Sequence, residues 1–175
     1  MSAVRRPRED DIVIAEGWRP GALGTIVALL AAYHCPRYRF GPAFETKVAR
    51  ELAEFMNRYD PDHDRLFLAL QGERVVGGMA IDGGEEKAGT QGARLRWFIL
   101  ADECQGRGVG GRMMDEAMRF LEQRFARCYL TTITGLDAAR TLYERRGFRL
   151  VEESEAANWG AAVTEQRFEW SADHC

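Results

Sequence analysis

The segment ARLRWFILADECQGRGVGG, residues 93–111, contains the pattern that decides the fold of this chain. Its first eight residues, 93–100, are mostly apolar or aromatic and predict a β-strand. A glycine-rich turn follows at residues 105–111, and beyond it apolar side chains recur at helical spacing. They are Met114, Ala117, Met118, Leu121 and Phe125. We therefore expect a strand, a glycine-rich turn and a long amphipathic helix, in that order.

The glycine-rich turn predicts a binding site for a diphosphate. Gly106, Gly108, Gly110 and Gly111 have no side chains, so backbone N–H groups in this turn can approach a ligand closely. The N-terminus of the following helix carries a partial positive charge, which favours an anion. A turn that only shapes a tight connection is the alternative interpretation.

Two common phosphate-binding motifs fit this turn poorly. Gly106, Gly108 and Gly111 satisfy the GxGxxG spacing of dinucleotide-binding proteins, but five residues separate the predicted strand from the first of them. In addition, the next predicted strand, residues 128–134, does not end on an acidic residue. A P-loop is excluded because Arg112 stands where that motif requires lysine. A dinucleotide-binding oxidoreductase is thus the weaker alternative.

A third motif matches a known family. Gln105-x-x-Gly108-x-Gly110 resembles the (Gln/Arg)-x-x-Gly-x-(Gly/Ala) motif with which GNAT acetyltransferases bind the pyrophosphate of coenzyme A. The segment AARTLYERRGF, residues 138–148, is similar to the family signature Ala-x-x-Leu-Tyr-x-x-x-Gly-Phe, and one helix and one strand separate it from the turn, as in the family.

The resemblance implies an α+β fold, the GNAT acyl-CoA N-acyltransferase fold, in which helices flank a central, mostly antiparallel mixed sheet. It also implies an acyltransferase of class EC 2.3.1.-, with acetyl-CoA as co-substrate and no metal. Such an enzyme transfers the acetyl group to a primary amine of a small molecule or peptide by direct attack in a ternary complex.

The resemblance also assigns residues to roles. In the family, backbone groups of the strand before the turn bind the pantetheine arm and polarise the carbonyl group. Tyr143 matches the tyrosine that protonates the departing thiolate and is the expected catalytic residue; its alternative role is that of a core aromatic. The expected cofactor-binding residues are Phe98, Ile99, Leu100, Gln105, Gly106, Arg107, Gly108, Val109, Gly110, Gly111, Arg112 and Tyr143.

Two departures from the family pattern bear on catalysis. Leu136 stands seven residues before Tyr143, where many members have an asparagine that contacts pantetheine. Where several members place a basic glutamate on a central strand, this chain has Thr131 and Arg96. A water chain or one of three carboxylates is then left to serve as the base: Glu85, Glu86 or Asp137. These departures keep open a catalytically silent acyl-CoA-binding sensor or regulatory module.

The rest of the chain predicts a frayed tail at residues 1–10 and a single GNAT domain over residues 11–171. Helices are expected to begin near Leu23 and at Pro42, the first stopped by Pro36, and a short helix through residues 138–143 is capped by Gly147. Six aromatic side chains near the first two helices suggest an acceptor pocket: Trp18, Tyr33, Tyr38, Phe40, Phe44 and Tyr59. Further strands are expected at residues 11–18, 65–71, 73–82, 128–134, 148–153 and 166–170.

Composition narrows the class of protein further. The net charge of −3 argues against nucleic acid as a partner, and no apolar run approaches the roughly 18 residues of a membrane span. A cytoplasmic protein is expected, with a homodimer possible by base rate. The four cysteines lack CxxC spacing and the three histidines are scattered, so neither a disulfide nor a metal site is expected. The aspartates at 60, 62 and 64 predict a turn, and Cys104 is expected to be a buried thiol.

Overall fold

The structure is a computed structural model that describes residues 11–84, 92–157 and 159–172. The predicted tail, residues 1–10, and the candidate bases Glu85 and Glu86 lie outside these ranges. Within them the strands form one seven-stranded sheet in the order β1-β2-β3-β4-β5-β7-β6. The strands are β1 (Ile12–Glu16), β2 (Arg65–Gln71), β3 (Arg74–Asp82), β4 (Ala93–Leu100), β5 (Arg127–Ile133), β6 (Arg149–Ala156) and β7 (Val163–Ser171).

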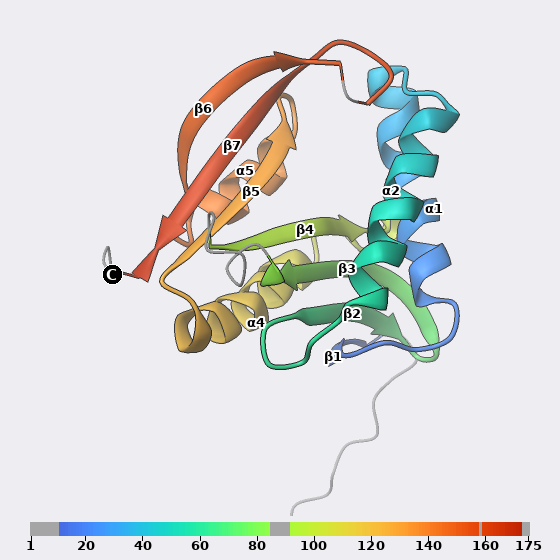
Figure 1. Ribbon diagram of the computed structural model, residues 1–175. Helices are drawn as coiled ribbons and strands as arrows, with labels where there is room; N and C mark the ends of the chain where they lie inside the picture. Colours follow the sequence, from blue (N-terminus) through green and yellow to red (C-terminus); the bar gives the residue numbers. More distant parts are fainter. Residues whose placement is uncertain (1–10, 85–91, 158, 173–175) are drawn as a thin grey trace, which may run out of the picture.

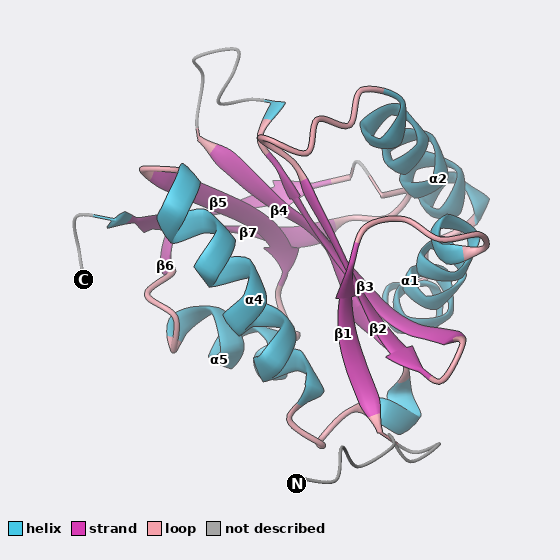
Figure 2. Ribbon diagram, turned by 90° about the horizontal axis from the view of Figure 1, so that it is seen from below, coloured by secondary structure: helices cyan, strands magenta, loops and turns pink. Residues whose placement is uncertain are grey.

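Helices cover both faces of the sheet (Figures 1 and 2). The helices are α1 (Ala22–Tyr38), α2 (Pro42–Asn57), α4 (Val109–Arg124) and α5 (Asp137–Glu144), with a short 3-10 turn, η1 (Asp102–Cys104), before α4. Helices α1 and α2 lie together on one face, and α4 and α5 lie on the other. Strand β2 is buried on both faces because Leu66 and Leu68 pack toward α1 and α2, while Phe67 packs into the core beneath α4. This arrangement confirms the predicted α+β fold with a mostly antiparallel mixed sheet.

Strands β4 and β5 diverge, which opens the centre of the sheet. Among the described strands they are the one parallel pair, and they share only two register positions, Ala93 with Cys128 and Arg94 with Tyr129. Beyond Arg94 the backbone of β4 is no longer paired with β5, while β5 stays paired with β7 along its whole length. The lower half of the sheet, β1 to β4, therefore separates from β5, β7 and β6, as Figure 1 shows.

Helix α1 corrects one prediction. It continues through Pro36 to Tyr38, although Pro36 was expected to stop it. Proline removes one backbone N–H and so one helical hydrogen bond, but only two residues of α1 follow Pro36, so a single bond is lost near the end of the helix. The Arg37 side chain donates a 2.7 Å hydrogen bond to the carbonyl of Tyr33, and left-handed Arg39 (φ 56°) donates its backbone N–H to Cys35. The helix therefore ends at a left-handed cap rather than at the proline.

Candidate active site

A β-bulge shapes the open edge of β4. The register with β3 shifts between Gly78 and Ala80, so that Trp97 and Phe98 both lie opposite Met79. Trp97 adopts a left-handed backbone conformation, with φ 52°. A bulky residue rarely adopts this conformation, which costs about 1–3 kcal/mol and commonly marks a functional site.

The bulge sends two aromatic rings to opposite faces of the sheet. The Trp97 ring meets Phe55 of α2 at 5.4 Å between centroids, while the Phe98 ring faces Tyr143 of α5 at 6.2 Å. The diverging edge of β4 thus has an α1–α2 side and an α4–α5 side, and each carries its own aromatic contact.

The glycine-rich turn ends at the N-terminus of α4. Gly108 is the residue that precedes the helix, with φ 76°, and the first helical bond runs from Arg112 N–H to the Gly108 carbonyl at 3.1 Å. No side chain in the described part of the chain caps this end. The N–H groups of Val109, Gly110 and Gly111 therefore have no acceptor within the helix and are available to an anion.

Gln105 has a structural role in the turn. Its side-chain amide donates to the carbonyl of Leu100, at the end of β4, and to the carboxylate of Asp102, both at 3.1 Å. These bonds tie the turn to the strand before it. Gln105 thereby fixes the position of the glycine-rich turn relative to β4.

One cavity of about 770 Å³ runs along the gap between β4 and β5. Its walls come from β4, β5, the glycine-rich turn, α5, α1 and α2. Leu136 and Asp137, at the start of α5, also line it. The predicted site residues in its wall are Phe98, Ile99, Leu100, Gln105, Gly106, Gly108, Gly110, Gly111 and Tyr143.

Three predicted cofactor-binding residues lie outside this wall. The Val109 side chain is buried in the core beneath α4, so only its backbone can face a ligand at the turn. Arg107 and Arg112 have exposed side chains on either side of Gly108. Contact between either arginine and a phosphate stays a prediction.

Tyr143 is at once a core aromatic and part of the cavity wall. It is 5% exposed and packs against the rings of Phe98, Phe148 and Phe168 at 6.1–6.2 Å. Burial raises the pKa of its hydroxyl well above the ordinary value. The hydroxyl therefore stays protonated at neutral pH and is in the form that can donate a proton.

Aromatic side chains surround the cavity on the α1–α2 side of the sheet. We call this end the aromatic chamber; it is lined by Tyr33, Phe44, Trp97 and Trp159. His34 also lines it, and burial, followed by the charge of Arg37, lowers the pKa of its imidazole to about 4. The imidazole is therefore neutral at physiological pH.

The aromatic chamber shares only part of its wall with the predicted acceptor pocket. Tyr33 and Phe44 line the cavity, but Trp18 is 57% exposed and lies outside its wall. Tyr38 stacks on Phe40 behind the chamber, and Tyr59 packs against Phe55. Trp97 and Trp159 were not predicted to line the pocket. Trp97 lies in the bulged strand β4 and Trp159 in the segment between β6 and β7, and no local pattern in the sequence indicates that the two segments meet.

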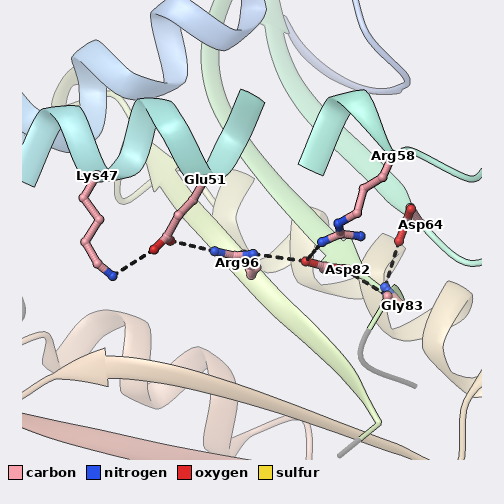
Figure 3. A network of polar contacts seen from close by, with 8 residues as sticks. Lys47, Glu51, Arg58, Asp64, Asp82, Gly83 and Arg96 are labelled. Carbon is pink, nitrogen blue, oxygen red and sulfur yellow. Dashed lines mark hydrogen bonds and ion pairs between the residues drawn. The ribbon is translucent and has the colours of Figure 1, made fainter. Parts of the chain in front are cut away.

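A chain of ion pairs borders the chamber (Figure 3). Lys47 and Glu51 of α2 are 2.9 Å apart, and the other Glu51 oxygen accepts a 2.7 Å bond from Arg96. Arg96 also reaches Asp82 at 3.1 Å, and Arg58 binds the same carboxylate at 2.6 Å. This arrangement links α2 to β3 and β4 through charged groups.

Asp82 is the buried centre of this chain, with only 1% of its surface exposed. Burial alone would raise the pKa of Asp82, but the bonds from Arg58, Gly84 and Arg96 lower it below its ordinary value. Next to it, Asp64 accepts the Gly83 N–H at 2.8 Å and the Asp60 N–H at 2.9 Å. The aspartates at 60 to 64 thus stabilise a turn, as predicted.

Glu51 is a cavity residue that sequence reasoning missed. The glutamate sought on a central strand is absent there, but Arg96 on that strand binds Glu51 from α2 instead. Burial would raise the pKa of Glu51, yet Lys47, Arg96 and Arg94 together lower it, so the carboxylate is ionised. A signal was present, since Glu51 lies three residues after buried Val48 and so faces the apolar side of α2.

Other reactive groups lie away from the cavity. Cys104 is fully buried, and this burial raises the pKa of its thiol, so it is not an activated nucleophile. Within the described ranges no three His, Cys, Asp or Glu side chains group as metal ligands do. No helix in the same ranges has the length and apolar character needed to cross a membrane.

Comparison with known proteins establishes the family. The model of the acetyltransferase (GNAT) family matches residues 11–148, so this chain belongs to that family. A search of curated proteins finds no significant match.

Solved structures share the fold at low identity. An acetyltransferase of the GNAT family from Staphylococcus aureus is 14% identical, with a TM-score of 0.70 over 93% of this chain and 99% of that one. A GNAT acetyltransferase from Streptococcus pneumoniae is 17% identical, with a TM-score of 0.68 over 92% of this chain and 99% of that one. The protein yncA from Salmonella typhimurium, solved with its cofactor acetyl-CoA, is 12% identical, with a TM-score of 0.70 over 94% of this chain and 95% of that one.

Proposed function

We propose that this protein is an N-acetyltransferase that moves the acetyl group of acetyl-CoA to a primary amine of a small molecule or peptide. Transfer occurs by direct attack while both substrates are bound. The observation that carries the proposal is the single cavity joining the N-terminus of α4, the free edge of β4, Tyr143 and the aromatic chamber. A thioester bound from one face of the sheet can thus meet an amine bound from the other.

The donor half of the cavity suits coenzyme A. The N–H groups of Val109, Gly110 and Gly111 and the dipole of α4 favour the pyrophosphate. The pantetheine arm contains amide groups, and the backbone of Phe98, Ile99 and Leu100 lacks a β5 partner, so the arm can bind there as an added strand does. Arg107 lies within the turn and Arg112 directly after it, and both supply positive charge.

The chemistry needs one proton donor and one proton acceptor. The amine nitrogen attacks the carbonyl carbon, an N–C bond forms, and the C–S bond then breaks. Tyr143 gives its hydroxyl proton to the departing thiolate. The proton lost by the attacking nitrogen restores the tyrosine through water, so that amine and thioester become amide and thiol with no net change in protons.

Release of free thiol from acetyl-CoA across a panel of primary amines tests this proposal. Amine-dependent thiol release, together with the acetylated amine in the mass spectrum, is the expected result. Tight binding of acetyl-CoA with no release in any reaction would instead favour a silent acyl-CoA-binding module. Leu136 in the cavity wall is the feature that favours that alternative. Binding of NADH in place of acetyl-CoA would indicate a dinucleotide-binding protein.

A further inference from the structure

One guanidinium in the cavity wall has no counter-ion among the residues that the structure describes. Arg94 of β4 lines the cavity, and among the described residues it forms no ion pair. Its Nε is buried without a hydrogen-bond partner, and its Cζ lies 5.5 Å from the centroid of the Tyr129 ring. A buried guanidinium donor without an acceptor is unfavourable, and a carboxylate or phosphonate fits its planar geometry.

The nearby charged side chains form ion pairs with one another rather than with Arg94. Each Glu51 oxygen accepts one cationic donor, from Lys47 on one side and Arg96 on the other. Arg96 is bound on its second nitrogen by Asp82. Among the described residues no carboxylate pairs with Arg94, so its positive charge is left unpaired at the cavity wall, two residues before Arg96 on the same strand.

The position of Arg94 relates it to the site of transfer. It lies three residues before Trp97 on the same strand, a span of about 10 Å between Cα atoms at the usual rise of a β-strand. Arg94 and Arg96 alternate with buried Leu95, so both arginines lie on the face of β4 from which Arg96 reaches Glu51 of α2. One small molecule can therefore reach from the guanidinium to the bulge.

We propose that the amine acceptor carries an anionic group, such as the carboxylate of an amino acid, which binds Arg94 while its apolar part packs in the aromatic chamber. The inference rests on the proposed function, since it names the class of acceptor for that reaction. It predicts a preference for apolar or aromatic amino acids over the corresponding neutral amines and over polyamines.

Three acceptors that share a benzyl group test the preference without altering the protein. Phenylalanine carries a carboxylate, phenylalaninamide an uncharged amide, and phenethylamine neither group. We expect kcat/KM for phenylalanine to exceed that of both neutral analogues by about tenfold or more, because a charge-assisted hydrogen bond is lost in each. Spermidine should be a poor acceptor. Equal or higher kcat/KM for the neutral analogues, or a preference for spermidine, would overturn the proposal.

Variants then connect the preference to the residue. Arg94→Gln should raise KM for phenylalanine and abolish its advantage over phenethylamine, and Arg94→Lys should retain part of it. Arg50→Gln is the matched control, because Arg50 is exposed on α2 and pairs only distantly with Glu54, at 3.9 Å. Unchanged acetyl-CoA affinity reports that each variant is folded. If Arg94→Gln keeps the full preference for phenylalanine, the proposed anion site is wrong.

A binding measurement separates this inference from the proposed function. If no amine releases thiol, the proposed activity fails, and N-acetylphenylalanine is titrated calorimetrically into the protein in the presence of coenzyme A. Binding that Arg94→Gln abolishes would retain the anion site. Absence of binding to the parent chain, or binding that Arg94→Gln leaves unchanged, would reject it.

Discussion

Gly110 offers the sharpest test of the coenzyme A site. A Cβ at this position would lie 3.1 Å from Cδ1 of Leu142 and 3.5 Å from Cζ of Phe98, and all three residues line the cavity. The backbone of Gly110 is helical, so a side chain strains nothing locally. Alanine at this position stabilises the helix by about 1 kcal/mol relative to glycine, but its Cβ requires the Leu142 side chain to move by a few tenths of an ångström. Valine adds two further carbons and costs about 1–2 kcal/mol of stability by overpacking.

Either side chain narrows the passage between the glycine-rich turn and β4. Loss of one charge-assisted bond from the helix N-terminus to the pyrophosphate corresponds to about 1.5–3 kcal/mol, or roughly a ten- to hundredfold weaker Kd. We therefore expect Gly110→Val to weaken acetyl-CoA binding by this factor in calorimetric titration, and Gly110→Ala to weaken it less. Urea unfolding should show that both variants remain folded.

Gly24→Ala is the matched control for Gly110→Ala, because Gly24 lies in α1 with open space around its Cβ position. It should gain stability from helix propensity and bind acetyl-CoA as the parent chain does. Gly108 is less suitable, since its φ of 76° makes any side chain cost about 1–2 kcal/mol in the fold itself. A folded Gly110→Val chain that binds acetyl-CoA as tightly as the parent would refute the placement of the donor.

Three further predictions concern protons and charges. Tyr143→Phe should lower kcat with little change in KM or in melting temperature, since the ring still packs on Phe98; unchanged turnover would remove its role as acid. Asp82→Asn should lower the free energy of unfolding in urea by about 2 kcal/mol; the loss is limited because Arg96 retains its ion pair with Glu51 and Arg58 is partly exposed. In the parent chain, the stability that the Asp82 charge supplies should disappear as pH falls through the lowered pKa of Asp82 in the folded state. Because the pKa of His34 is lowered to about 4, the native state resists its protonation, and stability should fall by at most about 3 kcal/mol as pH drops from 6.5 toward 4. His34→Phe should remove that part of the pH dependence, and an unchanged acid limb in its unfolding profile would contradict this assignment.

The sequence by itself determined those parts of the protein whose pattern is local. The turn at residues 105–111 needs glycines within one short segment, and the motif at residues 138–148 needs a tyrosine on one short helix, so both can be predicted from neighbouring residues in the sequence. The strands and helices around them follow from periodicity, which is again a property of neighbouring residues. The rule that proline ends a helix gave the wrong end for α1. The carbonyls of its last turn accept hydrogen bonds from the Arg37 side chain and the Arg39 N–H, and no pattern in neighbouring residues indicates these bonds.

Only the tertiary structure decided which side chains share the cavity. Glu51 and Arg96 come from a helix and a strand 45 positions apart, and Trp159 approaches Phe44 from the segment between β6 and β7. The divergence of β4 from β5 arises from pairing and a bulge, neither of which is encoded within one strand. Long-range packing sets these contacts, because a side chain's partners depend on how the whole sheet twists and opens rather than on the residues beside it in the chain.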